Sequence, residues 1–370
     1  MSQAYRVAVL HQGGPVPAVG GVIKPFKPGG DGLGYTDSGA DLAYNLRKRG
    51  ESAVTPVPDP VPTRDADWSF PDTISGIRSA VFEHGANVLW ANTTLHSSHA
   101  LVQLRSELAS RGVRMVGQNP LDTEKFEDKE WINRWLNGQP GLKGSFPRSM
   151  LFQKGHAKET LEGFGVPAVV KPIRGRGSHG VTLANTVLEL HVAAERLLAE
   201  SDAILLEEYC AGEEVTVTVM PPGEYTIVGT KSSYWSLPVV TRFNHKDGIA
   251  PYNGIVAVTA NSRALSASEH DADPSYATLQ RQCELVAELC RATAPIRVDA
   301  RRRGDGQGFN GEFVLFDVNM KPNATGPGRP GRELQASLTT MAAEMIGWDY
   351  RELIVNILKQ ARLVADVIRQ

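Results

Sequence analysis

Cysteine is scarce in this sequence of 370 residues, which contains only Cys210, Cys283 and Cys290. So small and odd a number in a long chain excludes a disulfide framework of the kind that stabilises small secreted domains. Long hydrophobic runs are missing too, since none approaches the roughly 20 residues that a membrane-spanning helix needs. The first apolar run, in MSQAYRVAVLHQGG, stops at Gly13 before it would form a signal-peptide core. We therefore expect a cytoplasmic protein with no membrane partner.

An excess of charge of one sign is also lacking, because 39 Lys and Arg residues are balanced by 41 Asp and Glu residues. This balance gives no indication of a nucleic-acid partner, which a strongly basic chain would suggest. Hydrophobic residues make up 41% of the chain and charged residues 22%, as in globular proteins. A chain of this length exceeds one small domain, so we expect two or three packed subdomains.

The first 120 residues alternate between apolar strand patterns and amphipathic helix patterns. A strand at residues 6–10 precedes a long glycine- and proline-rich loop, a helix that begins near Thr36, and further strands and helices up to VRMVG. Such alternation predicts a parallel sheet with helices on its faces. Residues 121–137 have the spacing of one helix, and strands dominate after them. We expect an α/β (α+β) protein whose subdomains span residues 1–120, 121–210 and 211–370.

Polar residues stand at alternating positions on two apolar strands near the end of the chain, IRVDARRR and EFVLFDVN. The glycine-rich segment between them predicts a hairpin turn, so the two strands would pair antiparallel. Alternate residues of a strand share one face, which places Arg297 beside Asp299, and Asp317 beside Asn319. Three converging oxygen ligands would suit magnesium, a hard cation. The alternative is a surface hairpin whose charged side chains are solvated.

A glycine-rich segment, VVKPIRGRGSHGVTLA, connects two further strands. Glycine lets backbone amides approach a phosphate closely, and Lys171 at the end of the first strand supplies a point charge. Arg174 and Arg176 on the same loop favour the interpretation that the loop binds an anion. The alternative is a plain hairpin turn without a ligand. The pattern is neither a P-loop nor a dinucleotide fingerprint, because a strand and not a helix follows it.

Acidic residues mark the end of the next strand, in AILLEEYCAGEEVTVTVM. Glu207 and Glu208 follow the apolar run, and Glu214 leads into a β-branched strand. Carboxylates at a strand end can accept hydrogen bonds from a ribose, and exposed backbone at such an edge can contact an adenine. Taken alone, the pattern is a weak signal, because charged residues at a strand end are usually just solvated.

In this order, the three segments resemble the ATP-grasp superfamily, and most of all its D-alanine:D-alanine ligase branch, from about Pro167 to Gly347. The resemblance implies an ATP-grasp fold, in which an N-terminal parallel α/β domain precedes two β-rich subdomains that clamp ATP. It also implies ATP and one or two Mg²⁺ ions as cofactors.

The resemblance further implies which residues contact ATP. Phosphate contacts would come from Lys171 and Ser178, and from a lysine preceded by aspartate, which is Lys129 with Lys125 as a second choice. The remaining contacts would be the hinge and ribose carboxylates and the backbone next to the adenine, namely Glu207, Glu214, Glu208, Tyr209 and Cys210.

Other residues would serve catalysis. Arg297 would steady an acyl phosphate, and the Mg²⁺ ligands would be Asp299, Asp317 and Asn319, with Asp317 in place of the usual glutamate. Residues 234–254 occupy the place of the catalytic lid and offer three candidates for the γ-phosphate contact: Arg242, His245 and Lys246. His245 is alternatively a general base. Backbone amides near Gly326 and Gly328 would hold a developing oxyanion.

The N-terminal part departs from the family. The His-Gly-x-x-Gly-Glu-Asp-Gly motif of the D-alanine ligases has no counterpart, since the matching region reads LWANTTLHSSHALVQ. The family glutamate that would hold an amino group falls at Leu33, within a glycine- and proline-rich insertion. We therefore expect the ATP-binding half to be kept and the substrate-binding half to be changed, so a cell-wall D-alanine ligase is not the best interpretation.

Several residues outside these motifs are candidates for substrate binding. His11, His96 and His99 lie at or near the ends of N-terminal strands, where they would line a carboxylate pocket or serve the structure. Arg329 and Arg332 in the last loop would bind a substrate carboxylate or face the solvent.

Together these features predict an ATP-dependent, ADP-forming ligase that joins a small-molecule carboxylate to an amine through an acyl phosphate. One alternative is a biotin-carboxylase-like enzyme that activates bicarbonate, in which ADP release would require bicarbonate. Another is a non-catalytic ATP-binding sensor, in which loss of Asp317 would change neither ATP affinity nor turnover. The resemblance also allows a homodimer, because homodimers are common in the family.

Overall fold

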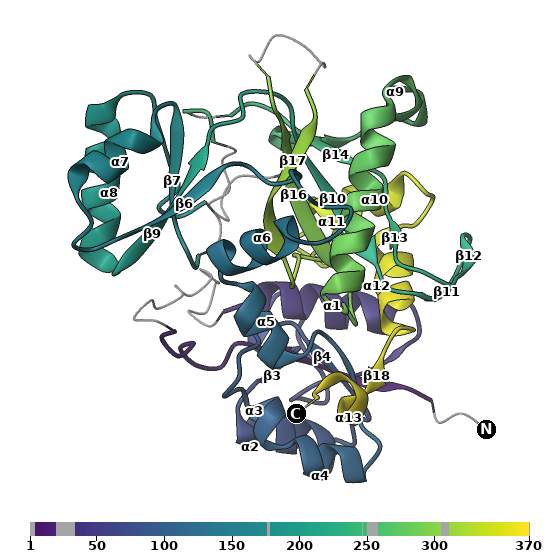
Figure 1. Cartoon of the computed structure of the whole chain (residues 1–370). Coiled ribbons are helices and arrows are strands. Elements are labelled where there is room, and N and C mark those ends of the chain that lie inside the picture. The colour runs from purple at the N-terminus through teal and green to yellow at the C-terminus, as the bar shows by residue number, and fades with distance from the viewer. Residues whose placement is uncertain are drawn as a thin grey trace.

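The computed structural model of the chain describes residues 4–19, 34–175, 178–245, 247–249, 258–304 and 311–369. These residues form a mixed α/β protein with three main sheets and a two-stranded hairpin (Figure 1). The predicted fold class is therefore confirmed.

The N-terminal sheet has the strand order β18-β5-β4-β1-β2, and β3 pairs with the end of β1. Its strands are β1 (Arg6–His11), β2 (Ser52–Val54), β3 (Phe70–Pro71), β4 (Val88–Ala91), β5 (Arg114–Val116) and β18 (Arg362–Leu363). Every pair is parallel except β18 with β5. The predicted parallel sheet is thus confirmed, and a strand from the other end of the chain extends it.

Helices pack against this sheet. They are α1 (Thr36–Lys48), α2 (Ile74–Arg78), α3 (Ala100–Gln103), α4 (Arg105–Ser110) and α13 (Val364–Val367), with a 3-10 turn at Asp65–Asp67 and a π-helical turn at Ser79–Glu83. α1 buries Leu42 and Leu46 in one cluster with Val7 and Val9 of β1. Residues 100–110 form two short helices, α3 and α4, because Leu104 between them departs from helical backbone geometry with φ −89° and ψ 4°.

Two helices connect the N-terminal sheet to the second one, α5 (Pro120–Phe126) and α6 (Lys129–Asn137). The prediction of one helix over residues 121–137 is wrong. Asp128 has extended backbone and its side chain accepts a hydrogen bond from Trp131 N at 2.9 Å, which makes it the N-cap of a new helix. This break places Lys129 at the first position of α6.

The second sheet is antiparallel, with the order β6-β9-β7-β8. Its strands are β6 (Ser149–Gln153), β7 (Ala168–Pro172), β8 (Thr182–Ala184) and β9 (Ala203–Glu208). α7 (Lys158–Phe164) and α8 (Val187–Glu200) cover the face turned away from β16 and β17 of the third sheet (Figure 1). Leu161 and Leu190 from these helices pack with Val170 and Ile204 of the strands.

The third sheet has the order β15-β14-β10-β16-β17, and β13 pairs with β10. Its strands are β10 (Glu214–Met220), β13 (Trp235–Ser236), β14 (Val240–Arg242), β15 (Ser262–Ala264), β16 (Ile296–Arg302) and β17 (Phe313–Asn319). β16 and β17 pair antiparallel as predicted, with Asp299 opposite Asp317 and Arg297 opposite Asn319. The turn between them at residues 305–310 lies outside the described residues.

The remaining elements surround this sheet. They are the hairpin of β11 (Gly223–Tyr225) and β12 (Gly229–Lys231), the 3-10 turn Val258–Ala260, α9 (Ala267–Ala272), α10 (Pro274–Leu289), α11 (Leu338–Glu344) and α12 (Tyr350–Leu358). Leu46 of α1 and Trp90 of β4 share one apolar cluster with Trp348 and Leu353, so the N-terminal sheet and α12 enclose a common core. Within the described ranges, no helix has both the length and the apolar character needed to cross a membrane.

Candidate active site

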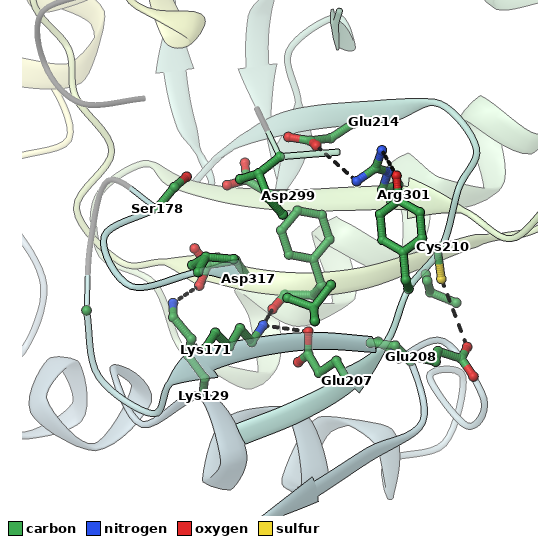
Figure 2. Close-up of a pocket in the computed structure, with 18 of the residues that line it drawn as sticks. Lys129, Lys171, Ser178, Glu207, Glu208, Cys210, Glu214, Asp299, Arg301 and Asp317 are labelled. Carbon is green, nitrogen blue, oxygen red and sulfur yellow. Dashed lines mark hydrogen bonds and ion pairs between the residues drawn. The ribbon is translucent and has the colours of Figure 1, made fainter. Parts of the chain in front are cut away.

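A cleft of about 910 Å³, part of it open solvent, lies between the second and third sheets. Figure 2 shows its side chains converging from β7 and β9 on one side and from β16 and β17 on the other. Most of the predicted ATP and metal residues line it, namely Lys129, Lys171, Ser178, Glu207, Glu208, Tyr209, Cys210, Glu214, Arg242, Asp299 and Asp317. Three more are each bonded to a lining residue, namely Arg297, Asn319 and His245. Lys246 lies outside the described residues.

Lys171 projects from β7 into this cleft and is buried with a carboxylate partner. Its Nζ lies 2.6 Å from Glu207 Oε2 and donates to the Phe316 carbonyl oxygen at 3.1 Å. The other carboxylate oxygen of Glu207 accepts from Asn133 Nδ2 of α6 at 3.2 Å. β7 and β9 pair antiparallel, which brings the lysine and the glutamate from two strands to one place.

Lys129 forms the second cationic contact. Its ammonium group makes a short ion pair with Asp317 Oδ1 of β17. Burial disfavours the charged ammonium, but the Asp317 carboxylate outweighs burial and raises the pKa of Lys129 above its ordinary value. Lys125, the second choice, packs instead over the ring of Trp131 at 4.1 Å and does not line the cleft.

Asp299 stands at the centre of the predicted metal site. Arg297 donates to it through Nε at 2.9 Å and Nη2 at 3.0 Å, and Thr216 Oγ1 donates at 2.6 Å. Burial alone would raise the pKa of Asp299, but Arg297, together with Arg242 and the Thr216 hydroxyl, holds that pKa below its ordinary value. Asn319 Nδ2 lies 3.2 Å from Asp299 Oδ2 and 3.4 Å from Asp317 Oδ2.

These spacings fit a magnesium ion. Oxygen ligands at 2.0–2.1 Å in an octahedron are about 3 Å from their neighbours. The amide of Asn319 can be turned so that its oxygen takes the place of its nitrogen, because heavy-atom positions do not distinguish them. No group of three His, Cys, Asp or Glu side chains within the described ranges is placed to hold a metal. Two carboxylates and one amide instead suit a magnesium ion that keeps water and phosphate oxygens as its other ligands.

The glycine-rich loop forms one edge of the cleft through Gly175, Ser178 and His179. Ser178 has left-handed backbone with φ 56°, so its conformation is set by the turn. Arg174 does not line the cleft; its Nη1 donates to the carbonyl oxygen of Glu124 on α5 at 2.7 Å. Arg176, the other arginine predicted to favour an anion, lies outside the described residues.

The predicted adenine segment follows β9 at the far end of the cleft. The backbone N–H of Tyr209 donates to the Pro167 carbonyl at 3.4 Å. Burial, reinforced by the neighbouring Glu208 carboxylate, raises the pKa of the Cys210 thiol to about 11. The Cys210 thiol is therefore neutral and only weakly polar at physiological pH. Such a side chain in the lining of the cleft suits contact with a flat apolar ring.

Glu214 at the start of β10 is buried among cationic side chains. Its carboxylate accepts from Arg242 Nη1 at 3.2 Å and meets His245 Nε2 at 2.9 Å. Glu214 thereby holds two of the three lid candidates, Arg242 and His245, at the cleft. The Nε and Nη2 groups of Arg242 are buried without a hydrogen-bond partner among the described residues.

Arg301 also lines the cleft, although the sequence analysis assigned it no role. Its guanidinium stands 4.8 Å from the ring centre of Tyr209, and its Nη1 donates to the Gly248 carbonyl at 2.8 Å. A signal was present in IRVDARRR, because the same alternation that pairs Arg297 with Asp299 also brings Arg301 to that face.

Gly326 and Gly328, the residues predicted to hold an oxyanion, lie where the last loop packs against two helices. A side chain at Gly326 would meet the ring of Tyr350 at 2.3 Å, and Gly328 adopts φ 106° beside Asn45. Neither glycine lines the cleft, so their positions give no support to an oxyanion role. Both instead allow the loop to pack closely on α1 and α12.

The arginines of this loop are bound to acids of the N-terminal domain. Arg329 is buried and its Nε donates to Asp41 Oδ1 of α1 at 2.6 Å, while a second nitrogen lies 2.8 Å from Asp65. Arg332 Nε donates to the same Asp41 at 2.9 Å, and its Nη2 lies 3.2 Å from Asp37. The alternative prediction that these arginines face the solvent is wrong for Arg329. Both side chains hold the loop to α1.

The predicted histidines stand at the carboxyl end of the N-terminal sheet. His11 Nδ1 lies 2.9 Å from Ser69 Oγ, and His99 Nε2 lies 3.0 Å from Asp72 Oδ2. The other ring nitrogen of His99 accepts a backbone N–H of α3 at 3.1 Å, so both nitrogens have structural partners. Burial, and then the neighbouring His99, lower the pKa of His96. These contacts favour a structural role for His11 and His99 over the lining of a carboxylate pocket.

A family model described as D-ala D-ala ligase C-terminus matches residues 148–359. The chain is 26% identical over 201 residues to the D-alanine–D-alanine ligase of Mannheimia succiniciproducens, covering 54% of this chain and 56% of that protein. It is 29% identical over 200 residues to that of Aromatoleum aromaticum, covering 54% and 55%. The chain thus spans little more than half the length of these two relatives.

Solved structures extend the likeness to the whole fold. A D-alanine–D-alanine ligase from Bacillus anthracis complexed with ATP superposes with a TM-score of 0.59 at 18% identity, covering 96% of both chains. The VanG D-Ala:D-Ser ligase from Enterococcus faecalis gives a TM-score of 0.59 at 14% identity, covering 97% of this chain and 99% of that one. At these identities the likeness shows the fold alone, which is the predicted ATP-grasp fold.

Proposed function

The chain belongs to the D-ala D-ala ligase C-terminus family, and on that premise we propose that it is an ATP-dependent, ADP-forming ligase that joins a small-molecule carboxylate to an amine. The observation that carries the proposal is the meeting of Asp299 and Asp317 across β16 and β17, beneath Lys129 and Lys171. Such an arrangement of cations and oxygen ligands suits phosphoryl transfer, which depends mainly on positioning and charge neutralisation.

In this proposal ATP would lie in the cleft in one direction. The segment from Glu208 to Cys210 and the apolar side chains of Val169 and Val314 line the end proposed for the adenine. Glu214 is the proposed ribose ligand, and Ser178 with the amides of the glycine-rich loop would contact the phosphates. Lys129, Lys171 and Arg242 would neutralise the negative charge of the triphosphate, exchanging their present carboxylate partners for phosphate oxygens.

Two chemical steps follow from this placement. An oxygen of the substrate carboxylate attacks the γ-phosphorus, the bond to the β-phosphate oxygen breaks, and ADP leaves. The amine nitrogen then attacks the acyl carbon, inorganic phosphate leaves with the C–O bonding electrons, and the amine loses a proton to give the amide. Arg297, beside Asp299, is placed to steady the acyl phosphate. Asp299, Asp317 and Asn319 would hold magnesium, which when bound supplies positive charge to the phosphate oxygens.

The lid contributes through His245, which we propose to be a phosphate contact rather than a general base. Its bond to Glu214 and the bond from Arg301 to the Gly248 carbonyl hold His245 and Gly248 at the cleft. A closed lid excludes water, which would otherwise hydrolyse the acyl phosphate.

Turnover of ATP with mixtures of carboxylates and amines tests the proposal. D-alanine, the substrate named for the relatives, is the first to include. We expect ADP and inorganic phosphate in equal amounts, only with magnesium and both substrates present. Release of AMP and pyrophosphate would contradict the proposal, and ADP release that needs bicarbonate alone would favour the carboxylase-like alternative. ATP binding without turnover of any mixture would favour the sensor.

A further inference from the structure

β10 lies directly beside β16, the strand that carries the proposed magnesium ligand Asp299. The two strands pair antiparallel, and their register sets Thr216 opposite Asp299. Alternate residues of a strand share one face, so Thr216 lies on the face of β10 that carries Glu214 to the cleft. Glu214 and Asp299 both line that cleft (Figure 2). The sequence analysis assigned no role to Thr216, although it stands two residues after Glu214 in EEVTVTVM.

The hydroxyl of Thr216 is bound to the carboxylate of Asp299. Its Oγ1 donates to Asp299 Oδ1 at 2.6 Å, a length typical of a hydroxyl bound to an ionised carboxylate. The carbonyl oxygen of Val298 is farther away, 3.4 Å from the same Oγ1. A hydroxyl has a single hydrogen to donate, so the shorter, charge-assisted bond to Asp299 is the one that holds it. Thr216 is buried and β-branched, so this donor is fixed within the sheet.

The two oxygens of the Asp299 carboxylate have different surroundings as a result. Oδ1 meets Thr216 Oγ1 at 2.6 Å and Arg297 Nε at 2.9 Å. Oδ2 lies 3.2 Å from Asn319 Nδ2, and the same amide nitrogen is 3.4 Å from Asp317 Oδ2. The Oδ2 atoms of the two aspartates therefore meet at the amide of Asn319, whereas Oδ1 of Asp299 is turned toward β10.

Arg297 also holds Asp299, with its Nε on Oδ1 and its Nη2 on Oδ2 at 3.0 Å. In the proposed reaction this arginine steadies the acyl phosphate, so its guanidinium has a second task at the reacting group. Thr216 lies behind Asp299, outside the described lining of the cleft. The last torsion of an aspartate side chain is broad and turns readily. A donor that stays behind the carboxylate keeps Oδ2 directed to the metal position while Arg297 contacts the phosphate.

We propose that Thr216 is a positioning residue for magnesium. Its hydroxyl holds Asp299 Oδ1, so that Asp299 presents Oδ2 as a single metal ligand beside Asp317 and Asn319. The inference rests on the proposed function and adds a residue that acts on the metal through Asp299. One oxygen from each carboxylate suits magnesium, which demands near-ideal octahedral geometry and keeps water or phosphate oxygens as its other ligands.

Manganese binding tests the role of Thr216 without turnover. Mn²⁺ suits the same oxygen ligands as magnesium, and electron paramagnetic resonance measures it in a titration of the full chain saturated with the β,γ-imido analogue of ATP. Thr216→Val keeps the shape of the side chain and removes the hydroxyl. Partners that orient a metal ligand commonly change metal affinity by roughly 10- to 100-fold, so we expect the Kd for Mn²⁺ to rise at least about tenfold.

A second pair of variants separates the hydroxyl from the packing of the side chain. Thr216→Ser and Thr216→Ala both lose the methyl group and differ from one another only in the hydroxyl. We expect Thr216→Ser to bind Mn²⁺ nearly as tightly as the parent, and Thr216→Ala to bind it about tenfold more weakly than Thr216→Ser.

Thr241→Val is the matched control. Thr241 of β14 also donates its hydroxyl to a carboxylate, at 3.0 Å from Glu213 Oε1, and both residues lie outside the described lining of the cleft. This variant therefore makes the same chemical change in the same sheet, away from the proposed metal ligands. It should leave the Kd for Mn²⁺ unchanged.

The affinity for the ATP analogue in EDTA separates the positioning of a metal ligand from damage to the cleft. The proposed lysine contacts with the phosphates do not depend on Thr216, so the metal-free Kd for the analogue should be the same in Thr216→Val and the parent. A loss of metal-free affinity as large as the loss of Mn²⁺ affinity would assign Thr216 to the general structure of the sheet and overturn the inference.

The remaining outcomes distinguish this inference from the proposed function. Equal Kd values for Mn²⁺ in Thr216→Val, Thr216→Ala and the parent would overturn the positioning role and leave the ligase function intact. A parent chain that binds neither the analogue nor Mn²⁺ would overturn the proposed function, and the inference with it.

Discussion

The ammonium nitrogen of Lys171 on β7 lies 2.6 Å from a carboxylate oxygen of Glu207 on β9, and their side chains are only 5% and 4% exposed. A charge so deeply buried requires a counter-charge, and Glu207 supplies it. The pair therefore both stabilises the second sheet and keeps the lysine directed into the cleft.

Removing one member of this pair should be costly. Lys171→Met leaves the Glu207 carboxylate buried and uncompensated, so the free energy of unfolding should fall by about 3–5 kcal/mol. The double variant Lys171→Met/Glu207→Leu should recover part of that loss, because it buries no unpaired charge. Urea unfolding of both variants and the parent measures this difference. A double variant less stable than Lys171→Met would contradict the paired arrangement.

Asp317 should be essential for turnover. Asp317→Asn removes a proposed magnesium ligand and the partner of Lys129, so kcat for ADP release should fall at least about 100-fold. Asp317→Glu keeps the charge and should retain most activity. Asp202→Asn changes an exposed carboxylate paired with Lys154 and is the matched control. Full activity in Asp317→Asn would remove the basis of the proposed magnesium site.

Arg329 should act on stability and not on substrate binding. Its guanidinium is buried against Asp41, so Arg329→Met should lower the free energy of unfolding by about 3–5 kcal/mol. At a temperature where the variant is folded, KM for the carboxylate should match the parent. The combined variant Arg329→Met/Asp41→Asn should be no less stable than Arg329→Met alone. A raised KM with unchanged stability would instead support the predicted contact with a substrate carboxylate.

Asp72 should make stability depend on pH. Burial would raise its pKa, but hydrogen bonds and charge from His99, with Thr93 and the Gly13 N–H, lower it below its ordinary value. A depressed folded-state pKa stabilises the protein fully above the unfolded value near ~4, and the stabilisation is lost as the pH falls through the folded value. Asp72→Asn should therefore cost about 1.5–3 kcal/mol at pH 7.

The difference between Asp72→Asn and the parent should shrink as the pH falls below about 4, since the parent carboxyl then becomes protonated as well. Unfolding by urea at a series of pH values between 3 and 7 gives this comparison. A difference that is constant over the whole series would show that the carboxylate charge has no part in the stabilisation.

Local patterns were sufficient for much of the site. Asp299 and Asp317 were predicted to face one another because strands alternate with period two and a glycine-rich turn joins them, and the register confirms it. Lys171, Glu207 and Glu214 were predicted from their spacing in the family motifs, and all three line one cleft. These predictions depend on residues that are neighbours along the chain or within one motif.

The sequence did not predict features of the structure that depend on contacts beyond the local pattern. The burial of Arg329 against Asp41 was not predicted, because the two residues are 288 positions apart in sequence. The helix predicted over residues 121–137 breaks at Asp128 because the aspartate side chain caps the second half. β18 extends the N-terminal sheet although its residues lie in the part of the chain predicted to form the C-terminal subdomain.

The sequence by itself determined the ATP-grasp fold, the order of the strands that carry Lys171, Glu207 and Asp317, and the kind of chemistry that these residues suit. Only the tertiary structure decided which charges are already neutralised and which remain directed into a cavity. Asp41 and Asp317 show the difference, since Asp41 is a buried counter-ion for two arginines and Asp317 lines the nucleotide cleft. The reason is physical, because the charge that a site presents depends on burial and on partners brought together by folding.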